Sequence, residues 1–115
     1  MKAESLTELV HEHLERARNA SSGRSAHTVH GGHQNQLRQT LIALAAGHRL
    51  DEHESPGEAT LQVLAGTVTL VTGDERQDSA VGAIVPIPDS RHSLEAVEDS
   101  AVLLTVVVRT TADNT

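Results

Sequence analysis

The chain has 115 residues, enough for one domain with a single core and too few for two. It contains no Cys, which excludes disulfides and thiolate chemistry, and no Phe, Tyr or Trp, which excludes an aromatic platform for stacking bases. The net charge of −7 opposes binding to nucleic acid or to anionic membranes. No apolar run approaches the roughly 20 residues of a membrane span, and we expect a cytoplasmic protein.

Residues 1–20 predict an N-terminal amphipathic helix. Ser5 and Glu8 fit a capping box at its start. Apolar residues then follow at helical spacing and form one stripe, namely Leu6, Leu9, Val10, Leu14 and Ala17. The pattern ends near Asn19. Because a helix of this length is marginal on its own, we expect it to dock on the rest of the domain or on a partner subunit.

From residue 24 to about residue 110 the pattern changes to short strands separated by turn residues. The candidate strands are 25–30, 37–46, 60–64, 67–72, 81–88 and 101–109. Gly31–Gly32, Gly66 and Gly73–Asp74 mark turns between them. Many short strands at close intervals predict a sandwich or a barrel. Residues 111–115 are expected to form a flexible tail.

Two segments of this region carry histidines in a frame of glycines and proline. The first, GHRLDEHESPGEATLQVLAG, contains Gly47, His53 and Gly66, and the second contains Gly82, Pro88 and His92. The frame resembles the two motifs of cupins, G-x5-H-x-H-x3/4-E-x6-G and G-x5-P-x-G-x2-H-x3-N, with one residue fewer between Pro and His. The chain is most similar to the small single-domain RmlC-like cupins of bacteria, common in actinobacteria, that carry an HESPGEATLQVL-type segment.

The resemblance covers roughly residues 37–108 and implies an all-β fold. This fold is the cupin double-stranded β-helix barrel, or jelly roll, here over residues 24–110 and preceded by the helix. It also implies that His53 and His92 face each other inside the barrel, where cupins commonly hold a metal with three His and one Glu. A homodimer is implied too, because cupins pair through sheet packing or strand exchange.

The cupin ligand set is incomplete in this chain. Ser55 stands where a second His is expected, and Ala59 stands where the Glu is expected. Glu58, one residue earlier, faces outward on a regular strand unless a bulge turns it inward. The two imidazoles of His53 and His92 can hold Zn²⁺, Ni²⁺, Cu²⁺ or Fe²⁺ when water or a carboxylate completes the shell. The alternative is that both line a metal-free polar pocket.

Further residues are candidates for lining the same pocket. On a regular strand, Asp51 and Ser55 share the face of His53. Gln62 lies further along the next strand and can offer an amide oxygen. Arg38 can bind a carboxylate inside the barrel if it points inward.

The remaining histidines are interpreted as surface residues. His27, His30 and His33 follow the pattern H-x2-H-x2-H, but the glycine turn between them directs the three side chains apart. His11 and His13 are two positions apart on a helix and cannot share a face, so we expect them at the surface or at a dimer contact.

Two functions of different classes fit these observations. One is a metal-dependent enzyme that acts on an unknown small molecule, with His53 and His92 as ligands. The other is a metal-free module that binds or senses a small ligand in the barrel. The sequence identifies no catalytic residue and does not decide whether the protein is an enzyme. Hydrolysis by a Ser triad is disfavoured because nothing resembles a nucleophile elbow.

Overall fold

One helix precedes nine strands in the computed structural model, which describes residues 1–53 and 57–108 and only the backbone of residues 52 and 53. The helix is α1 (Leu6–Asn19). The strands are β1 (Arg24–His30), β2 (Leu37–Leu44), β3 (Arg49–His53), β4 (Gly57–Ala65), β5 (Thr67–Thr72), β6 (Glu75–Ala80), β7 (Ile84–Pro86), β8 (His92–Ala96) and β9 (Ser100–Val108). Strands β3, β6 and β8 are absent from the candidate strands, although the assignment of Asp51 to the pocket assumes a regular strand at β3.

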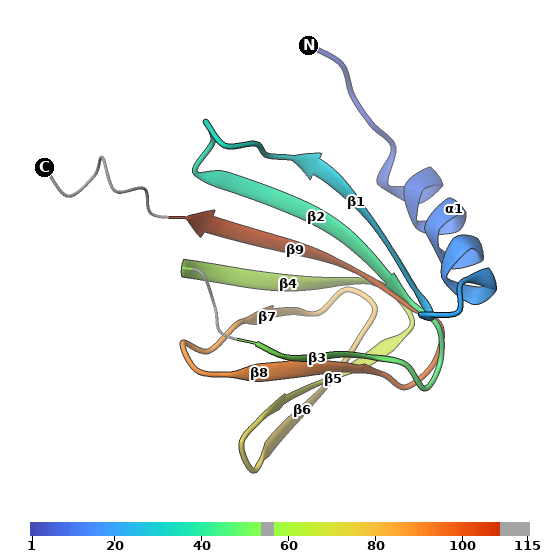
Figure 1. The fold of residues 1–115 in the computed structure, drawn as a ribbon, viewed down its shortest axis with the longest axis vertical. Coiled ribbons are helices and arrows are strands. Elements are labelled where there is room, and N and C mark those ends of the chain that lie inside the picture. The colour runs from blue at the N-terminus through green and yellow to red at the C-terminus, as the bar shows by residue number, and fades with distance from the viewer. Residues whose placement is uncertain (54–56, 109–115) are drawn as a thin grey trace, which may run out of the picture.

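The strands form two antiparallel sheets that pack face to face (Figure 1). One sheet has the order β1-β2-β9-β4-β7, and the other has the order β3-β8-β5-β6. In Figure 1 the sheets meet on the right and spread apart on the left. We call the left-hand side, where β3 and β9 end and β4 and β8 begin, the wide end of the barrel. The two sheets and the helix confirm the predicted all-β barrel with an N-terminal helix.

An aliphatic core fills the space between the sheets, as a chain without aromatic residues requires. Its buried members are Leu44, Leu61, Val63, Val68, Leu70, Leu94, Ala96 and Val102. The strand register explains why these residues form the core, because cross-strand partners share a face of the sheet. Leu61, for example, pairs with Leu104 on one side and with Val85 on the other. Alternate residues of each strand therefore point inward. Each fully buried large aliphatic side chain contributes roughly 1.5–3 kcal/mol to folding.

Helix α1 covers the outer face of β1, β2 and β9 (Figure 1). It begins where the sequence predicts, since the Ser5 hydroxyl accepts a hydrogen bond of 3.2 Å from the Glu8 N–H. Beneath it, Leu41, Ala43 and Ala101 are completely buried although they lie on the outer face of the sheet. The predicted docking of the helix on the domain is thus confirmed. The one helix in the described residues is too short and too polar to cross a membrane.

The chain passes between the sheets at a crowded junction opposite the wide end. Gly66 joins β4 to β5 with a φ of +75°, in the left-handed region that favours glycine. A Cβ at this position would overlap the carbonyl oxygen of Asp99 and the hydroxyl of Ser100. The Ser100 hydroxyl accepts a hydrogen bond of 3.1 Å from the Thr67 N–H. The chain crosses from one sheet to the other both at Gly66, between β4 and β5, and near Asp99, between β8 and β9. These two connections are in close contact because Gly66 has no side chain.

We predict that Gly66→Ala destabilises the fold more than Gly73→Ala does. Gly73 also has a positive φ, +56°, but a Cβ there meets nothing within 4 Å. Gly73→Ala should therefore cost only about 1–2 kcal/mol of left-handed strain. Gly66→Ala should add about 1–3 kcal/mol of overpacking. Urea unfolding of the two variants measures the difference, and equal losses of stability would contradict a crowded junction at Gly66.

Asp99 fastens the end of α1 to the turn between β8 and β9. Arg18 Nε donates a 2.6 Å hydrogen bond to Asp99 Oδ2, and the Ala46 N–H donates one of 2.8 Å to Oδ1. These two bonds, the one from Arg18 first, hold the pKa of Asp99 below its ordinary value. The carboxylate's contribution to stability is therefore complete above about pH 4 and is lost as the pH falls below that value.

We predict that Asp99→Asn flattens the acid side of the stability profile. The free energy of unfolding of the wild type should decline between about pH 5 and pH 3 more steeply than that of the variant, because Asn carries no proton-sensitive bond to Arg18. The difference should stay within about 1 kcal/mol, as for a partly exposed ion pair. Asp51→Asn is the matched control, since the Asp51 side chain is 89% exposed. A wild-type slope in Asp99→Asn would refute the assignment.

Candidate functional site

His92 is a buried imidazole at the wide end of the barrel. It begins β8, two residues before the core residue Leu94, so it lies on the inner face with only 5% of its surface exposed. Its ring Nδ1 lies 2.9 Å from the carbonyl oxygen of Ser90, which can only accept, so the ring nitrogen donates. This bond leaves the lone pair of the neutral ring on Nε2, as in imidazoles that bind metals or accept protons.

The backbone of His53 pairs directly with that of His92. The two residues are neighbours on one sheet, so they do not belong to opposite walls of the barrel. Leu50 pairs with Leu94, so three steps along β3 match two steps along β8, and a β-bulge lies between Leu50 and His53. The side chain of His53 and the whole of Ser55 lie outside the described residues. Whether the two imidazoles meet therefore stays a prediction.

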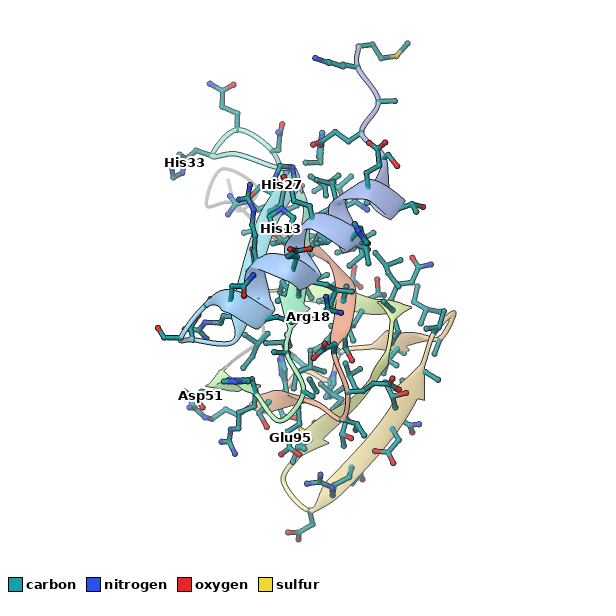
Figure 2. All side chains as sticks on the ribbon, turned by 90° about the vertical axis from the view of Figure 1, so that its right-hand side faces the viewer. His13, Arg18, His27, His33, Asp51 and Glu95 are labelled. Carbon is teal, nitrogen blue, oxygen red and sulfur yellow. The ribbon has the colours of Figure 1, made fainter. Side chains whose placement is uncertain are left out.

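Asp51 lies outside the barrel interior, which corrects its assignment to the pocket. Its side chain is 89% exposed, and its Oδ1 is 3.4 Å from Arg49 Nε on the same strand. Figure 2 shows Asp51 at the margin of the molecule. The assignment assumed strict alternation through residues 51, 53 and 55. The bulge after Leu50 breaks that alternation.

Strand β4 places its candidate residues on both faces of the sheet. Ala59 pairs with the buried Val106 on the inner face, so the position at which cupins carry Glu is apolar here. Glu58 and Gln62 alternate with the inward residues and are exposed on the outer face. Glu58 matches the expectation for a regular strand, and it lines an outer groove of about 450 Å³. Gln62 does not line the interior, which corrects its assignment to the pocket.

Arg38 is the member of the Arg38–Gln39 pair that lies on the inner face. It pairs with Val106, whereas Gln39 faces outward and donates a 3.2 Å hydrogen bond to Thr105 Oγ1. Arg38 is half-buried, and its Nε donates to the carbonyl oxygen of Asn35 at 3.3 Å. The inner surface of the wide end therefore carries one guanidinium on the five-stranded sheet.

A cavity of about 250 Å³ lies between the sheets at the side formed by β5, β6 and β7, and it is open to solvent along β6, where Glu75, Arg76 and Gln77 are exposed. Its lining residues are Leu70, Thr72, Glu75, Arg76, Gln77, Val85, Pro86 and Pro88. Leu70 pairs with Leu94 on β8 and with Gln77 on β6. Thr72 is two residues beyond Leu70, and His92 is two residues before Leu94. The antiparallel register therefore puts Thr72 beside His92 on the inner face.

The sequence interpretation missed this polar side of the cavity, although a signal was present. Val68 and Leu70 alternate as inward residues of a strand, which directs Thr72 inward as well. The two-residue Gly73–Asp74 turn then pairs Thr72 with Glu75 and returns Glu75 to the same face. If residues 67–80 are treated as a β-hairpin, the pattern predicts that Thr72 and Glu75 lie side by side on the inner face.

Arg76 does not neutralise the cavity's carboxylate. Its guanidinium binds Glu95 at 2.9 Å on the outer face of the sheet, and Figure 2 shows Glu95 on that side. The hydrogen-bonding groups along the cavity are the Thr72 hydroxyl, the Glu75 carboxylate and the Gln77 amide, whose Nε2 donates to the carbonyl oxygen of Asp78 at 2.9 Å and whose Oε1 can accept. The site therefore favours a ligand that donates hydrogen bonds.

The described residues do not complete a metal site. Within them, no group of three or more His, Asp or Glu side chains is placed to hold an ion. His92 is one imidazole on the inner face, and Ala59 supplies no donor at the position where a Glu is expected. The side chains of His27 and His33 point in different directions (Figure 2), so the H-x2-H-x2-H pattern does not bring these two imidazoles to one site. A metal at His92 would need further donors from water, from a ligand or from the part of the chain not described.

Comparison of the sequence with protein-family models and with curated proteins gives no match. The structure, however, superposes on an RmlC-like cupin protein from Desulfovibrio desulfuricans, with a TM-score of 0.71 and 25% identity over 93% of this chain and 96% of that one. The fold is that of a cupin. A conserved protein of unknown function from Streptococcus pyogenes has a TM-score of 0.70 and 27% identity over 80% of either chain.

The cupin fold also occurs in a larger enzyme that resembles this chain. A salicylate 1,2-dioxygenase from Pseudaminobacter salicylatoxidans has a TM-score of 0.72 over 87% of this chain and 33% of its own. Its identity to this chain is 18%, which shows a common fold and carries no information about the reaction. The function must therefore be argued from the site itself.

Proposed function

We propose that this cupin binds a small organic molecule in the cavity between its sheets, next to His92. The observation that carries the proposal is the polar row Thr72, Glu75 and Gln77, which lies beside Leu70 on one sheet and opposite Val85 on the other. Pockets for small molecules combine apolar walls with a few convergent polar groups in this way.

The size and charge of the cavity limit the ligand. About 250 Å³ is just below the ~300–1,000 Å³ of pockets for drug-sized ligands, which points to a smaller metabolite. The Glu75 carboxylate accepts hydrogen bonds and attracts positive charge, and the chain's net charge of −7 acts in the same direction. We therefore expect a small amine or amide with an apolar part.

We predict that small primary amines and amides bind at this cavity and that small carboxylates bind less well. Two-dimensional NMR of the labelled protein should show saturable shifts at Thr72, Glu75 and Gln77. Gln77→Ala should weaken binding about 2- to 10-fold, the equivalent of one hydrogen bond. The matched control is Gln62→Ala, which removes an exposed Gln from the outer face of the other sheet.

Two results would contradict the proposal. One is a panel in which no amine or amide gives saturable shifts at the cavity. The other is an equal loss of affinity in Gln77→Ala and Gln62→Ala, which would show that the ligand does not contact the cavity wall.

A second candidate function is binding of a divalent transition metal, Zn²⁺, Ni²⁺, Cu²⁺ or Fe²⁺, by His53 and His92. It is supported by the pairing of the two residues on adjacent strands and by the bond that sets the His92 lone pair on Nε2. Two imidazoles alone bind such ions weakly, and Ala59 leaves the set incomplete. Whether the protein catalyses a reaction depends on this point, and we assign no catalytic residue.

We predict that Ala59→Glu strengthens metal binding by at least about tenfold, because it places a carboxylate on the inner face at the position of the missing cupin ligand. Thr60→Glu is the matched control, since Thr60 is the next residue and faces outward. Titration with Zn²⁺ and Ni²⁺, and metal content after dialysis, measure the effect. The gain should vanish in a background with His53→Ala and His92→Ala.

The metal candidate fails on either of two results. One is equal metal affinity of Ala59→Glu and Thr60→Glu, which would place the ion elsewhere. The other is wild-type metal content in the variant that lacks both histidines. Neither result bears on the binding of amines at Gln77, so the two candidate functions are tested separately.

The resemblance to cupins also suggests how the protein assembles. We propose a homodimer, and the outer face of the five-stranded sheet beyond α1 offers exposed apolar side chains for it, namely Leu37, Ile84 and Val107. A bacterial, cytoplasmic protein that binds neither nucleic acid nor membranes stays a prediction from composition and charge.

A further inference from the structure

His13 is a buried titratable group that the proposed site does not use. It lies on the face of α1 that packs on β1, with 3% of its surface exposed. Its Nδ1 is 2.6 Å from the Ser25 hydroxyl of β1. The structure corrects the sequence expectation of a surface position, because His13 lies four residues before the fully buried Ala17 and shares its face of the helix.

A second imidazole lies against the first. Figure 2 shows His13 and His27 together between α1 and β1, and their ring centroids are 5.5 Å apart with the planes tilted by 41°. His27 Nε2 is 2.8 Å from the carboxylate of Glu4, which precedes the helix. The contact between α1 and β1 therefore includes two imidazoles, one of them buried.

The groups around His13 disfavour a positive charge on its ring. Burial, the largest effect, lowers the pKa of His13, and the nearby Arg16 and His27 lower it further. Glu12, whose carboxylate is 3.6 Å from His13 Nε2, raises it, but the same carboxylate also binds Arg16 at 3.2 Å.

The other strands packed against α1 supply no charge to offset this. β2 and β9 present apolar residues to the helix, including Leu41, Ala43 and Ala101, all with 0% exposure. The ion pair of Arg18 with Asp99 lies at the end of the helix, five residues beyond His13.

We propose that the His13–His27 contact is a proton-sensitive latch, in which a neutral His13 keeps α1 docked on the sheet and protonation of His13 releases it. A proton binds His13 more tightly when the helix is undocked, because the ring is then hydrated. Docking is therefore complete above about pH 6.5, the ordinary value for His, and weakens as the pH falls below it. Release would expose the outer face of β2 and β9.

The test is NMR of the full-length protein between pH 7.5 and pH 5. Amide exchange along α1 reports docking, and the His13 ring signals report its protonation directly. The undocking equilibrium should rise about tenfold for each pH unit by which docking lowers the His13 pKa. In His13→Gln, which keeps a hydrogen-bonding group toward Ser25 and takes up no proton, protection of α1 should not depend on pH over this range.

His11→Gln is the matched control, because His11 is an exposed histidine on the same helix and its loss should leave the wild-type pH dependence intact. Parallel loss of protection in wild type and His13→Gln would overturn the proposal. So would a His13 ring that titrates at or above the ordinary value. If His13→Gln is unprotected even at pH 7.5, the ring titration of the wild type decides, because it requires no substitution.

Discussion

Where α1 covers them, strands β2 and β9 are buried on both faces, and the rest of the structure depends on this. Their inner residues join the aliphatic core, and their outer residues, such as Leu41 and Ala101, are sealed by α1. The chain has no aromatic ring to cover this face of the sheet, and α1 provides the apolar cover instead. The small residues Ala17, Ala43 and Ala101 let the helix approach closely. The helix is thus part of the fold's stability, although it lies outside the barrel.

The position of the candidate site rests on strand register more than on residue identity. One bulge in β3 brings His53 to the level of His92 and turns Asp51 out into solvent. One two-residue turn brings Glu75 to the level of Thr72. A single-residue slip in either pairing would send these side chains to the opposite face. Register therefore determines which polar groups share the interior with His92.

Much of the fold could be predicted from the sequence, because apolar alternation and turn residues mark most strands and Ser5 marks the start of the helix. Strands β3, β6 and β8 are missing from the candidate strands, since none of them shows a long apolar alternation. The candidate site was predicted less well. His92 follows from motif spacing, but Asp51 was misplaced because bulges leave no clear sequence signature, and Gln62 because the inward phase of β4 is set by Leu61 and Val63.

The interior of this cupin-fold domain is asymmetric, and the asymmetry explains why the fold alone does not assign the chemistry. A metal site needs three or more donors that converge on one point. Here the five-stranded sheet presents Ala59 and Val106 at the level where a carboxylate would complete such a set. Arg38 is beside Val106 on that sheet, but a guanidinium is no metal ligand. The other sheet carries a row of polar groups from His92 across Thr72 to Glu75, and neighbouring strands lie about 4.8 Å apart. Donors spaced along one sheet in this way suit the several hydrogen-bonding groups of an organic ligand better than the single point of an ion.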